Sequence, residues 1–179
     1  MLYLDTSALV KLVRPELESK ALAAWLNARA GEASVTSAVT EVELPRAIRR
    51  SSPDRLGDIA AVLARLARFE IDAAVRATAA AYIDPGLRSL DAIHLATADH
   101  LRSSGKTISC FVTYDSRLAQ VVNSAGFVVC GPVLPVPFQT VHRQLTCEYA
   151  SHDCCWVGRS HRARCCAGTG GRSAGTGPT

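Results

Sequence analysis

Acidic residues stand at four points where the chain enters a predicted helix, and they offer the first recognisable chemistry. Two of them follow strand-like apolar runs and two lie in the first turns of helices: Asp5, Asp115, Glu43 and Asp91. In an open α/β sheet, strand carboxyl ends and helix amino ends face one crevice, so these carboxylates can converge there. Because like charges repel, such a cluster needs a cation to neutralise it. The sequence therefore predicts a cation site.

The predicted ligand set favours a hard divalent cation. The acids supply oxygen, and residues 1–133 show no matching cluster of His and Cys, which favours Mg²⁺ or Mn²⁺ over Zn²⁺. An ion held by a few carboxylates positions and activates water and neutralises charge on a phosphate. We therefore predict hydrolysis of phosphodiester bonds, with one catalytic and metal-binding set: Asp5, Glu43, Asp91 and Asp115.

Each acid also has a structural interpretation that the sequence leaves open. Asp5 and Asp115 can cap the helices that follow them, because such side chains accept hydrogen bonds from free backbone N–H groups. Asp91 can be a first-turn acid favoured by the helix dipole. Glu41 and Glu43 are two positions apart on a helix, so only one of them is expected to face the site. We choose Glu43 and interpret Glu41 as a solvated or capping residue.

Other polar residues are weaker candidates. Ser7 can contact phosphate or cap a helix, and Asp99 is either a peripheral ligand or a surface residue. His94 is expected to be half-buried and hydrogen-bonded to backbone, since metal activation of water makes a histidine base unnecessary. A basic cluster can bind RNA phosphates or form a solvated helix face. It consists of Arg46, Arg49 and Arg50.

Strands alternate with helices through the body of the chain. We expect strands at 2–4, 33–36, 69–71, 108–113 and 127–129. Helices are expected after Asp5, at 16–29, around 40–50, from Pro53 to Leu66, at 72–82, at 87–101 with Leu90 and Ile93 facing inward, and at 116–124. This alternation predicts an α/β fold with three layers, in which helices cover both faces of a mainly parallel central sheet.

Residues 134–179 differ from the rest of the chain. The 179-residue protein carries a formal net charge of +4; residues 1–133 hold 15 Lys and Arg against 14 Asp and Glu, and residues 134–179 hold 5 against 2. The tail has too few aliphatic residues to offset its ordering entropy. We therefore predict a folded domain at 1–133 and a disordered or non-native, frameshifted tail at 134–179.

Composition also sets expectations for redox state and location. A hydrophobic fraction of 48% is enough for a buried core. Cys110 and Cys130 are isolated in the body, so we expect reduced, buried thiols and no disulfide. With no charged leader and no apolar run of membrane-spanning length, we expect a cytoplasmic protein that spans no membrane.

Four short segments follow one another along the chain in an order typical of a known family. They are L-D-T-S-A-L at 4–9, E-L-P-R-A at 43–47, L-D-A-I-H-L-A at 90–96 and T-Y-D-S-R-L at 113–118. Over about residues 1–131 the chain resembles the PIN-domain ribonucleases, specifically the VapC-type toxins of toxin–antitoxin pairs. The resemblance implies a metal-dependent endoribonuclease and a homodimer inhibited by a small antitoxin laid across the cleft. It assigns the acidic set to Asp5, Glu43, Asp91 and Asp115, with Ser7 near the site. Pro45, close after Glu43, and the tail depart from the pattern.

Two other functions remain open from the sequence. A phosphatase of the haloacid dehalogenase type also places an Asp after its first strand, but it requires a second Asp two residues later, where this chain has Ser7. A catalytically silent module that binds RNA or an antitoxin would contain the same sequence motifs. Only cleavage of RNA distinguishes that module from an enzyme.

Overall fold

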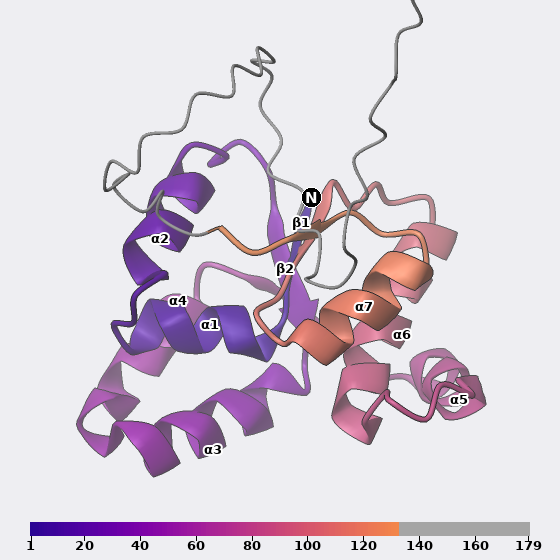
Figure 1. The fold of residues 1–179 in the computed structure, drawn as a ribbon, viewed down its shortest axis with the longest axis horizontal. Helices are drawn as coiled ribbons and strands as arrows, with labels where there is room; N and C mark the ends of the chain where they lie inside the picture. The colour runs from indigo at the N-terminus through magenta and orange to yellow at the C-terminus, as the bar shows by residue number, and fades with distance from the viewer. Residues whose placement is uncertain (133–179) are drawn as a thin grey trace, which may run out of the picture.

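Five strands form one all-parallel sheet in the computed structural model, which describes residues 1–132 (Figure 1). From one edge of the sheet to the other, the strands are β3 (Ala67–Phe69), β2 (Ser34–Ser37), β1 (Leu2–Leu4), β4 (Cys110–Val112) and β5 (Val129–Cys130). The predictions for residues 134–179 lie outside the described residues.

Helices cover both faces of this sheet. On one side in Figure 1 lie α1 (Thr6–Val13), α2 (Ser19–Asn27), α3 (Thr40–Ser51), the 3₁₀ helix η1 (Pro53–Asp58) and α4 (Ile59–Leu63). On the other side lie α5 (Ala73–Ala81), α6 (Ser89–Ser103) and α7 (Ser116–Ser124). The predicted three-layer α/β/α fold is confirmed. None of the helices within residues 1–132 is both long and apolar enough to cross a membrane.

The first strand is the centre of the core. Successive side chains of a strand point to opposite faces of the sheet, and both faces of β1 are covered. Leu2 and Leu4 pack into the cluster on the α1 side, whereas Tyr3 packs into the cluster that includes Phe111 and residues of α6 and α7. This explains why the run that precedes Asp5 is apolar at every position.

The strand order reverses direction beside Asp5. From β1 the chain proceeds through β2 to β3 in one direction across the sheet, and then returns to β4 and β5 on the other side of β1. Ligand sites in open parallel sheets lie at such a reversal, outside the carboxyl ends of the strands. Asp5 follows β1, and Thr113 and Asp115 follow β4, so these residues flank the reversal.

Several predicted elements differ from the observed ones. The strand expected at 69–71 is β3, two residues earlier, because Ala67 to Phe69 pair with β2 before the chain turns into α5. The helix expected from Pro53 divides into η1 and α4, consistent with the low helix propensity of Gly57. Leu90 is exposed instead of inward, because α6 turns Ala92, Leu95, Ala98 and Leu101 toward the core.

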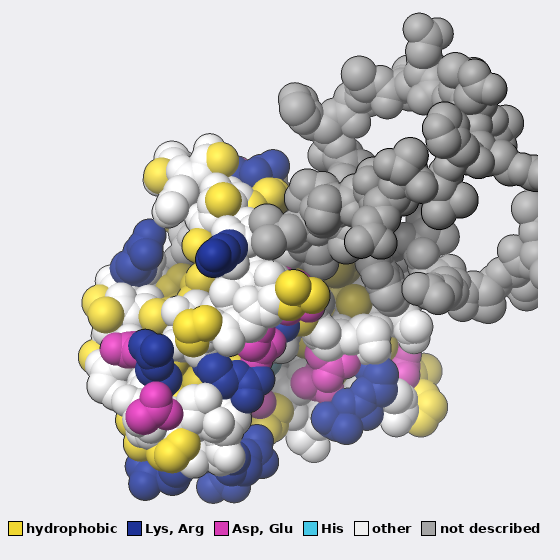
Figure 2. All heavy atoms as spheres, turned by 60° about the vertical axis from the view of Figure 1, so that its left-hand side comes forward, with side chains coloured by type: hydrophobic (Ala, Val, Ile, Leu, Met, Phe, Trp, Pro, Cys, Tyr) yellow, Lys and Arg dark blue, Asp and Glu magenta, His cyan; other side chains and the backbone are white. Residues whose placement is uncertain are grey.

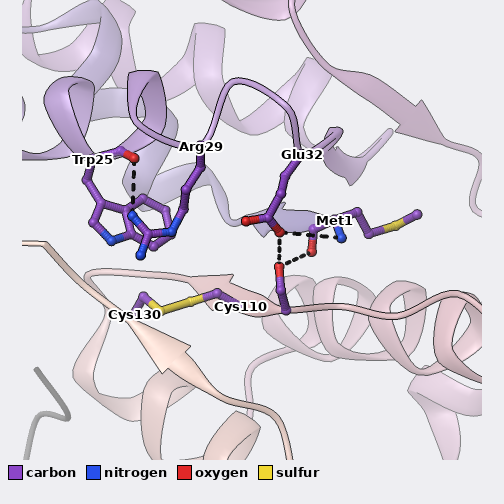
Figure 3. The surroundings of a disulfide bond; sticks show 7 residues. Met1, Trp25, Arg29, Glu32, Cys110 and Cys130 are labelled. Carbon is purple, nitrogen blue, oxygen red and sulfur yellow. Dashed lines mark hydrogen bonds and ion pairs between the residues drawn. A yellow bond between two sulfur atoms is a disulfide. The ribbon is translucent and has the colours of Figure 1, made fainter. Parts of the chain in front are cut away.

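The two cysteines of the body form a disulfide, so the expectation of reduced thiols is wrong (Figure 3). Cys130 lies on β5 directly beside Val112 of β4. Cys110 is two residues before Val112 and therefore on the same face of the sheet, where both cysteines adjoin the α1-side core. The prediction failed because the chain separates the cysteines by 20 residues, and only the pairing of β4 with β5 brings them together.

Candidate active site

Asp5 is held in place by the start of α1 and the end of β4. Its side chain caps α1, and Oδ2 accepts hydrogen bonds from Ser7 N (3.1 Å), Ser7 Oγ (2.6 Å) and Thr113 Oγ1 (3.0 Å). Asp5 is 5% exposed. Three donors on Oδ2 hold the carboxylate in one orientation, and His94 Nε2 of α6 lies 3.5 Å from Oδ1.

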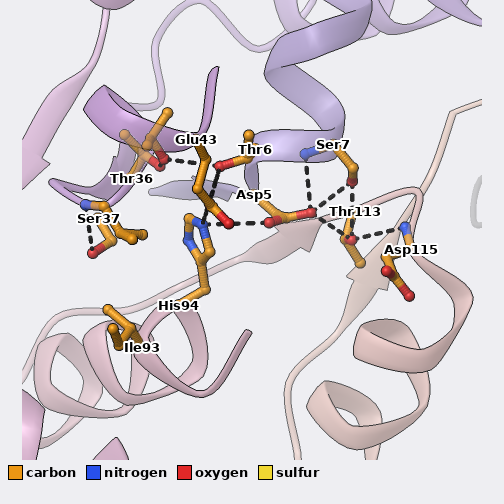
Figure 4. Close-up of polar contacts among 12 residues, drawn as sticks. Asp5, Thr6, Ser7, Thr36, Ser37, Glu43, Ile93, His94, Thr113 and Asp115 are labelled. Atoms are coloured by element: carbon orange, nitrogen blue, oxygen red, sulfur yellow. Dashed lines mark hydrogen bonds and ion pairs between the residues drawn. The ribbon is translucent and has the colours of Figure 1, made fainter. Parts of the chain in front are cut away.

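Ser7 connects the two loops that carry acidic residues (Figure 4). Its hydroxyl donates to Asp5 and accepts a hydrogen bond from Tyr114 N at 2.8 Å. Thr113 Oγ1 in turn accepts from Asp115 N at 3.1 Å. Thr113 was not predicted as a site residue; its signal in the sequence is a hydroxyl at the end of a strand, two residues before an acid.

Asp115 is a helix cap as well as a member of the acidic set. Its Oδ1 accepts from Arg117 N (2.8 Å) and Leu118 N (3.3 Å) at the start of α7. Oδ2 lies 3.6 Å from Arg117 Nη2. The structural interpretation is thus observed, and it does not exclude the site interpretation, because only Oδ1 is used by the cap.

Glu43 reaches the site from α3. Thr6 Oγ1 donates to Glu43 Oε2 at 2.6 Å, and His94 Nε2 lies 3.0 Å from the same oxygen. Burial opposes ionisation of Glu43, but the hydrogen bonds from His94 and Thr6 outweigh it and lower the pKa of this carboxyl. Pro45 lies inside α3, which continues past it to Ser51. Glu41 points elsewhere and pairs with Arg68 Nε at 2.6 Å in an exposed position.

A ladder of threonine hydroxyls positions α3 against β1. Thr36 Oγ1 donates to the Leu4 carbonyl at 2.7 Å and lies 2.9 Å from Thr40 Oγ1, which is 3.3 Å from Thr6 Oγ1. These hydroxyls are buried or nearly so, and they connect β2, β1, α1 and α3 beneath Glu43. Sequence reasoning did not identify Thr6, Thr36 or Thr40 as part of the site.

Asp91 has a buried oxygen with no partner. Among residues 1–132, Oδ2 of Asp91 is buried without a hydrogen bond. Burial and the charges of Asp5 and Asp115 raise the pKa of the Asp91 carboxyl. A buried polar atom without a partner costs roughly 1–3 kcal/mol, more when it is charged. The charges of Asp5 and Asp115 therefore act on Asp91.

His94 differs from the expectation in burial and in partners. It is 1% exposed, and its ring nitrogens contact side chains: Nδ1 lies 3.0 Å from the Tyr3 hydroxyl, and Nε2 contacts Glu43 and Thr6. Burial disfavours the imidazolium, whereas the Glu43 hydrogen bond and the nearby Asp5 charge raise the pKa of His94 above its ordinary value. The expectation failed because all of these partners are distant in sequence.

The remaining candidates lie apart from this network. Asp99 accepts a hydrogen bond from the Tyr82 hydroxyl and pairs with Arg102 NH2 at 2.6 Å. The basic cluster Arg46, Arg49 and Arg50 is exposed on α3. In Figure 2, Lys and Arg side chains gather at the bottom of the molecule, where α3 lies in Figure 1, and acidic side chains lie near the middle of the same face.

The donor set fits a hard divalent cation. The acids supply only oxygen, and the partnerless Oδ2 of Asp91 is an atom for which a cation would provide the missing contact. As the side chains stand in residues 1–132, no group of three His, Cys, Asp or Glu is close enough to hold a metal ion. Binding therefore requires side-chain rotation, for which the half-buried Asp91 is suited.

A cavity lies on another part of the molecule. It has a volume of about 510 Å³ and lies beside α2, α4 and the start of β2, where Leu26, Val62 and Leu66 line it. Arg29, which stacks on Trp25 with its guanidinium carbon 4.1 Å from the ring centroid, is at its margin (Figure 3). None of the predicted site residues lines this cavity.

Comparison with known proteins places this architecture in one family. The PIN domain family model matches residues 2–123. Ribonuclease VapC35 of Mycobacterium tuberculosis is 56% identical over 132 residues, which cover 74% of this chain and 97% of that protein. Ribonuclease VapC47 of the same organism is 38% identical over 135 residues, with the same coverage of each chain.

Solved structures agree in fold. The crystal structure of M. tuberculosis VapC20, described as a sarcin–ricin loop cleaving toxin, superposes with a TM-score of 0.57 at 18% identity and covers 74% of this chain and all of that one. VapBC2 from Rickettsia felis, bound to a DNA fragment from its promoter, gives a TM-score of 0.51 at 15% identity, over 74% of this chain and 99% of that one. The chain therefore belongs to the PIN-domain family and, within it, to the VapC ribonucleases.

Proposed function

We propose that this VapC-type endoribonuclease toxin hydrolyses RNA phosphodiester bonds with a divalent cation, Mg²⁺ or Mn²⁺, held by Asp5, Glu43, Asp91 and Asp115. The observation that carries the proposal is the buried, partnerless Oδ2 of Asp91, whose carboxyl pKa is raised by burial and by the charges of Asp5 and Asp115. A cluster that destabilises the folded protein in this way is explained by a cation that it binds.

The chain's own residues prepare the site before any substrate arrives. Ser7 and Thr113 occupy Oδ2 of Asp5, which leaves Oδ1 beside His94 Nε2, 3.5 Å away. Thr6 holds Glu43 of α3 beside the same nitrogen. When bound, the cation would position and activate the attacking water and neutralise charge on the phosphate. Preset carboxylates reduce the reorganisation that the reaction would otherwise require.

The exposed arginines of α3 are suited to the RNA backbone. Arg46, Arg49 and Arg50 follow Glu43 on the same helix. Arginines that neutralise phosphates contribute to RNA affinity, and this contribution weakens as the salt concentration rises. We propose that they hold RNA beside the acidic site; this function predicts a rise in KM with salt and a smaller rise when all three are replaced by Gln.

The next prediction concerns the cation. RNA cleavage by the full-length protein should require Mg²⁺ or Mn²⁺ and stop in EDTA, with activity restored by excess Mn²⁺. A panel of structured RNAs, resolved on denaturing gels, measures this dependence. Undiminished cleavage in EDTA contradicts the metal proposal, and RNA binding without cleavage under every condition identifies the silent module instead.

Another prediction concerns an inhibitory partner. VapBC2 from Rickettsia felis is a complex, and we propose that this chain likewise pairs with a small antitoxin and forms a homodimer. A cleft rich in carboxylates should attract an Arg or Lys of the antitoxin, which would compete with the cation. Co-expression with the adjacent gene should yield a complex that cleaves RNA only after the partner is removed. Equal cleavage by complex and free protein contradicts this mode of inhibition.

A further inference from the structure

The His94 side chain contacts groups from three other elements at the site. It lies on α6, and its ring reaches Thr6 of α1 and Glu43 of α3 (Figure 4). It also reaches Tyr3 of β1. It is buried, so it cannot contact RNA directly. Its partners lie 51 to 91 positions away in the sequence. The imidazole therefore fixes how three separate parts of the chain meet.

The hydrogens of this network can be assigned from its donors and acceptors. Thr6 has one hydroxyl hydrogen and gives it to Glu43 Oε2 at 2.6 Å, so Thr6 can only accept from His94. Ionised Glu43 can also only accept. Nε2 of His94 must therefore carry a hydrogen, which it directs to Glu43 at 3.0 Å. This conclusion holds for the neutral ring and for the imidazolium.

The other ring nitrogen explains why this orientation is fixed. Nδ1 lies 3.0 Å from the Tyr3 hydroxyl, and a tyrosine that donates there leaves Nε2 as the protonated nitrogen of the neutral ring. Tyr3 is itself immobile, because it is 0% exposed and its ring stacks on Phe111 with centroids 4.6 Å apart. Tyr3 thus sets the tautomer of His94 from the core of the sheet.

From this geometry we infer that His94 is a positioning residue, which fixes Glu43 of α3 relative to Asp5 of β1 so that both carboxylates are set for the cation. Nε2 donates to Glu43 at 3.0 Å and lies 3.5 Å from Asp5, so one ring nitrogen lies between the two acids. The inference rests on the proposed function, since it assumes that these acids form the catalytic site. Partners of this kind, which orient ligands without touching the metal, commonly change metal affinity or activity by about 10–100-fold when replaced.

Two amide substitutions distinguish the roles of the two ring nitrogens of His94. The side-chain nitrogen of His94→Gln can occupy the place of Nε2 and donate to Glu43, whereas the shorter His94→Asn reaches only the place of Nδ1 and keeps the contact with Tyr3. His100 lies on the same helix and is exposed, so His100→Gln and His100→Asn are matched controls. The full-length variants are compared for kcat, KM, melting temperature and Mn²⁺ affinity by titration.

We expect His94→Asn to lower kcat and to weaken Mn²⁺ binding, each by about 10–100-fold, with little change in KM for RNA. His94→Gln should recover a large part of both losses, and the His100 variants should match the wild type. Equal losses in His94→Gln and His94→Asn, or a fall in melting temperature without a change in Mn²⁺ affinity, would overturn the inference, because either result describes a residue that only fills space.

Tyr3→Phe provides a test if the His94 variants do not fold. It removes the hydroxyl that donates to Nδ1, so the ring is held with Nε2 toward Glu43 by one hydrogen bond fewer, and Mn²⁺ affinity should fall by about 10-fold. Unchanged affinity in Tyr3→Phe overturns the inference. Asp5→Asn in the same assays distinguishes failure of the proposed catalytic site from failure of the positioning role of His94. If Asp5→Asn still cleaves RNA, the proposed site is wrong. If it is inactive while His94→Asn behaves as wild type, only the role of His94 fails.

Discussion

Replacing Asp91 by Asn is expected to abolish RNA cleavage while raising the melting temperature of the metal-free protein. A cation contributes several kcal/mol of transition-state stabilisation, and each 1.36 kcal/mol is a factor of ten in rate. Loss of a ligand should therefore reduce kcat by about 10³-fold or more. Stability should change in the opposite direction, because Asn removes a half-buried charge that is repelled by Asp5 and Asp115.

The expected rise in the melting temperature of Asp91→Asn can also be tested through its pH dependence. Asp91 has a raised pKa in the folded protein, so its ionised form destabilises the fold at neutral pH. That penalty diminishes as the pH falls through the raised pKa and is absent below the ordinary value of 3.8. In EDTA, the difference in melting temperature between Asp91→Asn and wild type should be largest near pH 7 and shrink toward pH 4. A variant that is less stable than wild type at pH 7 contradicts the account.

Asp5→Asn is expected to remove cleavage without a comparable loss of stability. Asn is as good a helix cap as Asp, and its side-chain oxygen can accept the hydrogen bonds that Ser7 and Thr113 donate. The negative charge is lost, so kcat should again fall by about 10³-fold or more, since metal ligation supplies several kcal/mol. Asp5→Ala should be inactive and also less stable by about 0.5–2 kcal/mol, because the cap is lost.

Glu41→Gln is the matched control for these acidic replacements. Glu41 is exposed and pairs with Arg68, two positions from Glu43 on the same helix. Cleavage by Glu41→Gln should equal that of the wild type, whereas Glu43→Gln should be strongly impaired. The reverse result would transfer the site role to Glu41 and would mean that α3 presents its other side to the crevice.

The sequence was sufficient to predict the sheet and the two acids that follow its strands, because both follow from local pattern. The apolar run before Asp5 indicates a strand buried on both faces, and an acid at the carboxyl end of such a strand lies at the ligand-binding edge of a parallel sheet. The same reasoning applies to Asp115 after β4. These inferences require only the alternation of strands and helices.

The network around the acids could not be predicted because its contacts are long-range. Thr113 reaches Asp5 from 108 residues away, and His94 reaches Tyr3 from 91 residues away. Whether His94 bonds to backbone or to side chains depends on which face α6 turns to the sheet, and the exposure of Leu90 shows that this face was misjudged. The disulfide was missed for a similar reason, since only strand pairing places Cys110 near Cys130.

The most direct test of the account is a titration of the full-length protein with Mn²⁺, with free Mn²⁺ measured by electron paramagnetic resonance. The wild type is compared with the double variant Asp5→Asn/Asp91→Asn, and RNA cleavage is measured on the same samples. We predict that the wild type binds Mn²⁺ and cleaves RNA, and that the double variant remains folded but does neither. Equal Mn²⁺ binding by the two proteins, or cleavage of RNA by the double variant, would contradict the claim that these carboxylates hold the catalytic cation.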